Sequence, residues 1–224
     1  MIIDFIDTSL EEIPLSKPYS IAYKTTSSIK NLLVKIVLKN GVYGLGAASV
    51  SKYVVGVDTQ EAFFAAKDYQ SSLVGKNISE VFKNIEAVEK DLSFNPGARA
   101  AINIALHDVY CKHTNISLGG LLGQKTSPLP TSVTVGIKSA TETIAEIEEY
   151  LAGGFKNIKI KLGEEVEKDI ERMLKVQERF GNSIVVRIDA NQGWSFEETL
   201  TFVGAVKNIE LIEQPLNVNS SEEY

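Results

Sequence analysis

The sequence has little of several features that define whole classes of protein. It contains one cysteine among 224 residues, which excludes an internal disulfide. No stretch reaches the roughly 18 uninterrupted apolar residues of a membrane-spanning helix. The first residues, MIIDFIDTSLEEIPL, carry acids where a signal peptide has a basic region and then a long apolar one. We therefore expect a cytoplasmic protein with no membrane partner.

An excess of basic residues is also lacking. The formal net charge is −6, and acidic and basic residues are interspersed along the chain without a basic cluster. Such a surface does not neutralise the phosphates of nucleic acids, so we expect no nucleic-acid partner. The composition is that of an ordinary globular protein, with 44% hydrophobic residues, which is enough to bury a sizeable core.

The first part of the sequence predicts an α+β domain over residues 1–125. β-Branched and aromatic residues give the pattern of strands up to about residue 50, with Asn40-Gly41 as a hairpin turn. Three helical segments follow. Thr59 is expected to cap the first, and Pro96 is expected to begin the third. Strands followed by helices are typical of an α+β fold.

From residue 126 to residue 224 the pattern changes to short strands that alternate with amphipathic helices. Strands are expected within the segments TSVTVGI, FKNIKIKL, SIVVRIDAN and IELIEQP, with a helix between each pair. This alternation predicts a second domain with a parallel sheet, open or closed into a barrel, and functional side chains where the strands end. No Gly-rich phosphate loop follows these strands, which argues against nucleotide binding.

Two lysines share one face of the second of these strands. In N-I-K-I-K-L, Lys159 and Lys161 alternate with three apolar residues, so one side of the strand can pack under helices while the lysines point the other way. An ammonium group removed from water loses its hydration unless anions compensate it. Two solvated lysines on an edge strand are the alternative that this segment leaves open.

Each of the next two strands ends in an acid. Asp189 lies near the carboxyl end of V-V-R-I-D-A-N, and Glu213 takes the equivalent place in I-E-L-I-E-Q-P. One βα unit separates Lys161 from Asp189 and Asp189 from Glu213, so the three residues are expected at one level of the sheet. Carboxylate oxygens suit Mg²⁺, which keeps waters or substrate oxygens in its remaining positions. For either acid alone, a turn or helix-capping role is the alternative.

These motifs resemble the signatures of the muconate-lactonising subgroup of the enolase superfamily. The resemblance rests on K-I-K at 159–161, D-A-N-Q-G-W at 189–194 and E-Q-P at 213–215, and it extends back through N-P-G-A-R-A-A-I-N-I-A-L-H-D and L-G-G-L-L-G. It implies an α+β capping domain followed by a (β/α) TIM-type barrel, of which this sequence holds the first half. Within the subgroup the sequence is most similar to dipeptide epimerases.

The resemblance implies an isomerase that epimerises dipeptides such as Ala-Glu by removing an α-proton through an enediolate stabilised by Mg²⁺. Lys161 would be the acid and base on one face of the substrate α-carbon, and Lys159 would lie near the substrate carboxylate and help hold the enolate. Asp189 and Glu213 would be two of three metal ligands. Cationic and metal neighbours of a lysine disfavour its ammonium form and are expected to bring it toward a useful base strength.

Two further residues are expected at the substrate. Lys24 falls in the loop between the first strands that, in dipeptide epimerases, closes over the substrate, where its charge could meet a carboxylate. Thr134 falls where the family has a substrate-contacting threonine on the first barrel strand. A solvated lysine and a threonine chosen for strand propensity are the alternatives. Trp194 is expected to pack over the barrel rim.

Three family elements have no counterpart in these 224 residues: a third acidic ligand, a lysine facing Lys161, and a D-x-D motif that binds the ammonium group of the dipeptide. We therefore expect a portion of a longer enzyme that is active only as the complete chain. Its expected partners are a small-molecule dipeptide and, in a homo-oligomer, other copies of itself. The alternatives are a cycloisomerase, an N-acylamino acid racemase, an o-succinylbenzoate synthase, or an inactive fragment or binding module.

Overall fold

A computed structural model describes residues 1–21, 24–125 and 127–220 of the chain. The chain divides into two compact units. Unit 1 comprises Met1–Leu15 and Ser28–Thr126, and unit 2 comprises Ser16–Ser27 and Ser127–Tyr224. The domain boundary expected between residues 125 and 126 stays a prediction. No helix in the described part of the chain is long and apolar enough to cross a membrane.

Three strands form one sheet in the order β1-β2-β3. Strand β1 spans Ile3–Ile21, β2 spans Lys24–Leu38 and β3 spans Tyr43–Ser49. Strands β2 and β3 pair antiparallel, and Gly41 in their turn has a φ of +83°, as the hairpin prediction requires. The end of β1, from Ser16, and the start of β2, up to Ser27, belong to unit 2.

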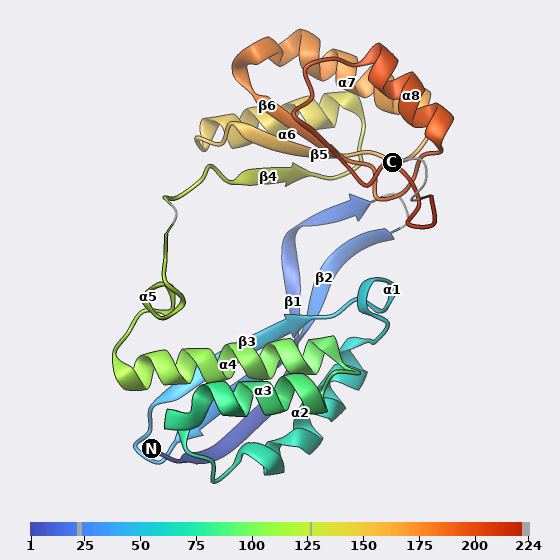
Figure 1. The fold of residues 1–224 in the computed structure, drawn as a ribbon. Coiled ribbons are helices and arrows are strands. Elements are labelled where there is room, and N and C mark those ends of the chain that lie inside the picture. Colours follow the sequence, from blue (N-terminus) through green and yellow to red (C-terminus); the bar gives the residue numbers. More distant parts are fainter. Residues whose placement is uncertain (22–23, 126, 221–224) are drawn as a thin grey trace. The chain divides into compact units, whose positions relative to one another are not determined.

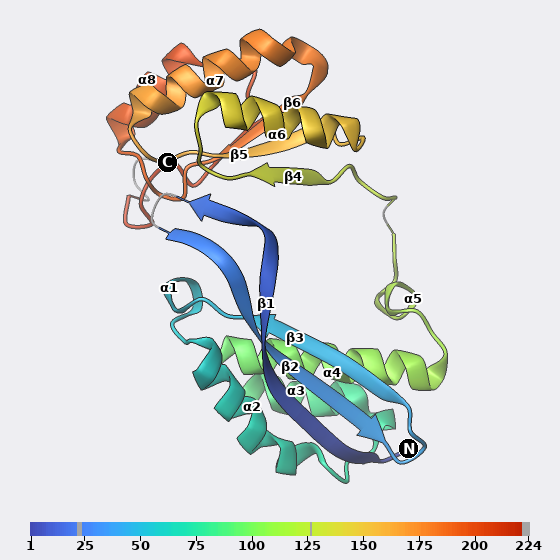
Figure 2. The ribbon, with the colours of Figure 1, turned by 180° about the vertical axis from the view of Figure 1, so that it is seen from behind.

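Helices α2, α3 and α4 cover one face of this sheet (Figures 1 and 2). The helical elements of unit 1 are α1 Lys52–Val55, α2 Thr59–Leu73, the 3₁₀ turn η1 Ile78–Glu80, α3 Val81–Asp91, α4 Pro96–Thr114 and α5 Leu118–Leu122. The expected cap of α2 is wrong by one residue. Asp58 is the cap, because its carboxylate accepts the Glu61 N–H while the Glu61 carboxylate accepts the Asp58 N–H.

Strand β3 and helix α4 pack backbone against backbone. A Cβ atom on Gly46 would overlap the carbonyl oxygen of Ala101, and one on Gly44 would meet backbone atoms of Ala105. Both alanines are fully buried. The lack of a side chain at Gly44 and Gly46 therefore sets how closely the helix approaches the sheet.

Gly46→Ala is accordingly expected to lower the free energy of unfolding by about 1–3 kcal/mol, because the added methyl group meets backbone that cannot rotate away. Urea unfolding monitored by circular dichroism measures this loss. Gly204→Ala is the matched control, since nothing lies within 4 Å of a Cβ at Gly204, in α8 (Phe196–Ala205). It should cause no loss and a gain of up to about 1 kcal/mol. Equal stability of the two variants would contradict the close packing.

Unit 2 contains a parallel sheet in the order β4-β5-β6-β7, with helices on one face (Figure 2). Its strands are β4 Ser132–Val135, β5 Asn157–Lys161, β6 Val185–Asp189 and β7 Leu211–Glu213. Its helices are α6 Ala140–Ala152, α7 Val166–Phe180, the 3₁₀ turn η2 Gly181–Ser183, and α8. The predicted fold class, an α+β part followed by a parallel β/α region, is confirmed.

The apolar face of β5 packs under the helices of unit 2, as its alternating pattern predicts. Ile158 and Ile160 are fully buried, and Met173 and Val176 of α7 belong to the same hydrophobic cluster. This burial fixes which face of β5 is turned away from the helices, and that face carries both lysines.

Candidate active site

The carboxyl ends of β5, β6 and β7 bring one lysine and two acids into a row. Lys161, Asp189 and Glu213 are partners in the register of the parallel sheet, one from each strand. The structure thus agrees with the expectation that they lie at one level. Nearer the start of the strands, Thr134 of β4 is paired with Lys159 of β5.

Both lysines bind the same carboxylate. Lys159 Nζ lies 2.8 Å and Lys161 Nζ 2.6 Å from Asp189 Oδ2, and Lys159 Nζ also lies 2.5 Å from Glu213 Oε2. The side chain of Asp189 is 2% exposed and that of Lys161 10%, so these charges are removed from water and compensate one another. The alternative of two solvated lysines on an edge strand is wrong, since β5 lies between β4 and β6.

Neighbouring charges set the pKa values in this row. Burial raises the pKa of Asp189, but hydrogen bonds from Lys159, Lys161 and the Asn191 N–H outweigh it and hold the pKa below its usual range. Burial lowers the pKa of Lys159, but its bonds to Asp189 and Glu213 outweigh that effect and raise the pKa. With these two acids as its neighbours, Lys159 is held as an ammonium ion.

Asn191 completes the surroundings of Lys161. Its Oδ1 accepts a hydrogen bond from Lys161 Nζ at 2.9 Å, and its backbone N–H donates to Asp189 Oδ1 at 3.0 Å. The φ of Asn191 is +48°, a conformation that asparagine adopts more readily than most residues. The sequence analysis gave Asn191 no role. Its signal is the D-A-N triplet, which places a second polar side chain two residues after Asp189.

Two glycines let the loops after β5 and β6 touch. Gly163 has a φ of +104°, and a Cβ atom there would overlap the carbonyl oxygen of Ala190. A Cβ atom on Gly193 would overlap the carbonyl oxygen of Gly163. The backbone N–H of Trp194 donates to the carbonyl oxygen of Pro215 at 3.1 Å, which connects the loop after β6 to the loop after β7. The loops that carry the row are thus held together by their backbone.

A buried acid on α7 lies next to these loops. Asp169 is fully buried and accepts hydrogen bonds from the backbone N–H groups of Gly163 at 2.9 Å and Glu164 at 3.2 Å. It also accepts from the Trp194 indole N–H at 3.2 Å and from Arg172 Nη2 at 2.5 Å. Burial raises the pKa of Asp169, and these donors oppose the rise. Asp169 is not among the site residues predicted from the sequence, and its signal there is an acid inside the apolar stripe of α7.

Trp194 packs in the hydrophobic cluster of unit 2, in the loop after β6, and its expected place over the rim of a complete barrel stays a prediction. It is 3% exposed, and its ring lies 4.6 Å from that of Phe202, centroid to centroid. The hydrogen bond from its indole N–H to Asp169 explains how a polar group is accepted there.

The two acids of the row fit a magnesium ion. Asp189 and Glu213 supply the hard oxygen ligands that Mg²⁺ prefers, and both contact one cationic group in this structure, the ammonium of Lys159. Magnesium is commonly held by one or two carboxylates, with water or substrate in its other positions. Among the residues that the structure describes, no three His, Cys, Asp or Glu side chains are placed to hold a metal ion.

The two expected substrate residues have different outcomes. Thr134 is half-buried on β4, beside Lys159 on the neighbouring strand. The backbone of Lys24 begins β2 and is not in a loop, and its side chain lies outside the described residues. The hairpin end that carries it packs beside the loop after β4, because the Ile137 N–H donates to the Ser20 carbonyl oxygen at 3.1 Å.

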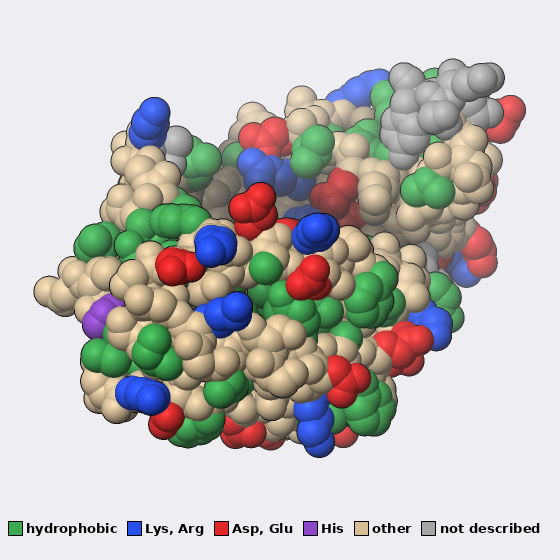
Figure 3. Space-filling model, turned by 60° about the horizontal axis from the view of Figure 1, so that its bottom comes forward, with side chains coloured by type: hydrophobic (Ala, Val, Ile, Leu, Met, Phe, Trp, Pro, Cys, Tyr) green, Lys and Arg blue, Asp and Glu red, His purple; other side chains and the backbone are tan. Residues whose placement is uncertain are grey.

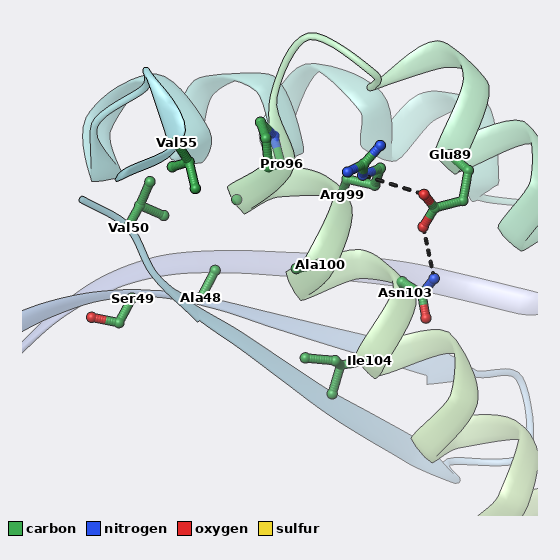
Figure 4. Close-up of a pocket in the computed structure, with 11 residues that line it drawn as sticks. Ala48, Ser49, Val50, Val55, Glu89, Pro96, Arg99, Ala100, Asn103 and Ile104 are labelled. Carbon is green, nitrogen blue, oxygen red and sulfur yellow. Dashed lines mark hydrogen bonds and ion pairs between the residues drawn. The ribbon is translucent and has the colours of Figure 1, made fainter. Parts of the chain in front are cut away.

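A pocket of about 590 Å³ in unit 1 is a weaker candidate for an active site than the row in unit 2. It lies between the end of β3 and the first half of α4 and is lined mainly by apolar side chains (Figure 4). Its charges are compensated, because Glu89 lies 3.3 Å from Arg99 Nε and accepts a hydrogen bond from Asn103 at 2.9 Å. The face of the molecule seen in Figure 3 mixes acidic, basic and hydrophobic side chains. We therefore take the row in unit 2 as the candidate active site.

Two protein families match the sequence. Residues 6–123 match the mandelate racemase / muconate lactonizing enzyme N-terminal domain, and residues 142–224 match the enolase C-terminal domain-like family. The chain is 41% identical over 215 residues to the L-Lys-D/L-Arg epimerase of Desulforapulum autotrophicum, an alignment that covers 95% of this chain and 60% of that protein. The chain thus spans about 60% of the length of the curated relatives it matches.

Solved structures of dipeptide epimerases are similar over the whole chain. The enzyme from Methylococcus capsulatus, in complex with Mg and the dipeptide L-Arg-D-Lys, gives a TM-score of 0.93 at 36% identity and is covered over 64% of its length. A substrate-liganded complex of the L-Ala-D/L-Glu epimerase from Bacillus subtilis gives a TM-score of 0.92 at 30% identity, also covered over 64% of its length.

Proposed function

Because the chain belongs to the mandelate racemase / muconate lactonizing enzyme family of the enolase superfamily, we propose that the protein containing it is a dipeptide epimerase. The observation that carries the proposal is the row of Lys161, Asp189 and Glu213, which places a candidate base beside two candidate ligands for a cation. Relatives of 41% and 36% identity with epimerase activity support it. The activity is proposed for the protein as a whole.

In this proposal Lys161 moves the proton at the α-carbon of the substrate. An α-proton beside a carboxylate is very weakly acidic, so its removal needs positive charge where negative charge develops. Lys159, held as an ammonium ion, supplies one such charge. Asp189 and Asn191 hold the Nζ atom of Lys161 in place, so that proton transfer begins from a fixed geometry.

Asp189 and Glu213 are proposed to hold Mg²⁺. When bound, the ion supplies positive charge to the substrate carboxylate as the α-proton leaves. The contact of both acids with Lys159 supports this assignment, since the pair already accommodates one positive charge. Thr134, paired with Lys159 in the sheet, is proposed to contact the substrate.

Two observations favour different dipeptides. The L-Lys-D/L-Arg epimerases, at 41% and 39% identity, favour a cationic second residue, which is our leading proposal. Lys24 favours an acidic second residue, as in Ala-Glu, and L-Ala-D/L-Glu epimerases are relatives of 31–33% identity. The position of the hairpin end beside the loop after β4 supports a role for Lys24 at the same edge of the sheet.

The protein that contains this chain is therefore expected to epimerise L-Lys-L-Arg with a higher kcat/KM than L-Ala-L-Glu. Exchange of the α-proton in deuterium oxide with Mg²⁺ present, followed by NMR, measures kcat/KM for both dipeptides. L-Ala-L-Leu is the reference, because its second residue has an uncharged side chain. Lys24→Met removes the charge but keeps the length of the side chain. If Lys24 binds the side-chain carboxylate of the second residue, this variant loses about tenfold in kcat/KM on L-Ala-L-Glu alone. That loss is expected for one charge-assisted hydrogen bond from a lysine, which cannot form the bidentate pair of an arginine.

Each outcome of this experiment decides between named alternatives. A higher kcat/KM for L-Ala-L-Glu in the wild type would favour the acidic class over the cationic one. An equal loss on all three dipeptides in Lys24→Met would mean that Lys24 orders the hairpin and does not select charge. The absence of exchange with every dipeptide would remove the epimerase proposal.

A further inference from the structure

The position of Lys161 depends on two different loops. Its backbone ends β5 and leads into the loop that contains Gly163, whereas the two partners of its ammonium group, Asp189 and Asn191, lie at the end of β6 and just beyond it. A shift of one loop against the other would therefore move Nζ away from the atoms that hold it.

Asp169 hydrogen-bonds to both loops at once. Its Oδ2 atom accepts from the backbone N–H groups of Gly163 and Glu164 after β5, and from the indole N–H of Trp194 after β6. Its other oxygen holds Arg172, whose Nη1 lies 3.4 Å from the carbonyl oxygen of Lys161. One carboxylate thus connects the backbone that carries Lys161 with the loop that carries its partners.

A charged pair is not needed at this place for packing alone. Asp169 and Arg172 are 0% and 5% exposed on a helix whose neighbouring buried positions are apolar, so both charges lose their hydration. An apolar pair of similar volume would fill the space without that loss. An apolar pair could not accept hydrogen bonds from the three N–H donors of the two loops, and so could not fix their direction.

We infer that Asp169 and Trp194 are positioning residues that hold Lys161 in register with Asp189 and Asn191. Neither is placed to touch substrate; they act through the loops after β5 and β6. The catalytic consequence rests on the proposed function, whereas the geometric consequence, the limited freedom of the Lys161 ammonium group, does not.

The test uses two variants of the protein that contains this chain. Asp169→Asn keeps the shape of the side chain but removes its charge. Its NH₂ group then faces either the N–H groups of Gly163, Glu164 and Trp194 or the guanidinium of Arg172, and it cannot accept a hydrogen bond from them. Trp194→Phe removes the indole N–H and keeps a ring against Phe202. A displacement of about 1 Å can cost about a hundredfold in rate, so kcat should fall roughly 10- to 100-fold in Asp169→Asn and less in Trp194→Phe, with KM nearly unchanged.

A second measurement needs no turnover. Acylation by isotopically labelled acetic anhydride, quantified by mass spectrometry, reports how accessible each lysine is. Lys161 is buried and hydrogen-bonded to Asp189 and Asn191, and Lys159, two residues earlier on the same strand, is the internal reference. The ratio of Lys161 to Lys159 labelling should rise about threefold or more in both variants, because local opening of the loop frees Lys161 selectively.

Glu171→Gln is the matched control, since Glu171 lies on the same helix in an exposed pair with Lys175. Values of kcat and of the labelling ratio in both variants equal to those of this control would overturn the inference. Equal increases for both lysines would also overturn it, since they indicate general loosening. If Asp169→Asn does not fold, Trp194→Phe decides. If the wild type turns over no dipeptide, the proposed function fails, and the labelling ratio still decides the positioning role.

Discussion

Lys161→Ala in the protein that contains this chain is expected to abolish epimerisation and to slow α-proton exchange of one epimer by about 10³-fold or more. The reason is that a positioned acid and base contributes about 10²- to 10⁴-fold to proton transfer, and alanine leaves no group near the α-carbon on that face. Exchange of the other epimer is retained in part, since the family resemblance implies a second base on the opposite face.

NMR in deuterium oxide, with each epimer supplied separately, measures the two exchange rates. Lys168→Ala is the matched control, because it removes an exposed lysine that pairs with Glu165 on the surface of unit 2. It should leave both rates unchanged. Wild-type rates for both epimers in Lys161→Ala would show that another group moves the proton.

Asp189→Asn is expected to weaken Mg²⁺ binding more than about 100-fold, and Glu213→Gln should have an effect in the same direction. Loss of a group that only supports a ligand already costs about 10- to 100-fold, so loss of a ligand should exceed that range. Asp189→Asn should also lower the free energy of unfolding by about 3–5 kcal/mol, because two ammonium groups lose the carboxylate that compensates them. Glu213 is more exposed, so the loss of stability is smaller there.

Isothermal titration calorimetry gives the affinity, and circular dichroism confirms that each variant is folded. Glu197→Gln, on the exposed side of α8, is the control for removal of a carboxylate. Magnesium affinity equal to that of the wild type in both Asp189→Asn and Glu213→Gln would exclude the row as the metal site.

The order of strands and helices could be predicted because it depends on local pattern. Alternation of apolar and polar residues in β5 indicates its buried face, and Ile158 and Ile160 are fully buried there. The same pattern, repeated once per βα unit, predicts that Lys161, Asp189 and Glu213 lie at one level. Such a periodicity predicts the folded structure correctly because the sheet has to bury one of its two faces, which fixes the register of each strand.

The remaining features depend on contacts between distant segments. Asp169 looks like a charge placed wrongly on an apolar helix face until Gly163, Glu164 and Trp194 supply its donors. The sequence alone likewise gives no sign that the indole N–H of Trp194 has Asp169 as its partner. The capping error at the start of α2 is different, since Asp58 and Glu61 already form the capping-box spacing in the sequence.

The register of unit 2 also affects how such a site can change during evolution. Because each strand delivers its own side chain to the edge, a substitution at one strand end alters one chemical function and leaves the hydrogen-bond ladder intact. The loops that follow these strands are less independent, because glycine contacts and the Asp169 carboxylate join those after β5 and β6, and backbone hydrogen bonds join those after β6 and β7. A substitution at Asp189 is therefore expected to disturb both lysines, which share its carboxylate, whereas a substitution at Glu213 removes one of the two acidic partners of Lys159.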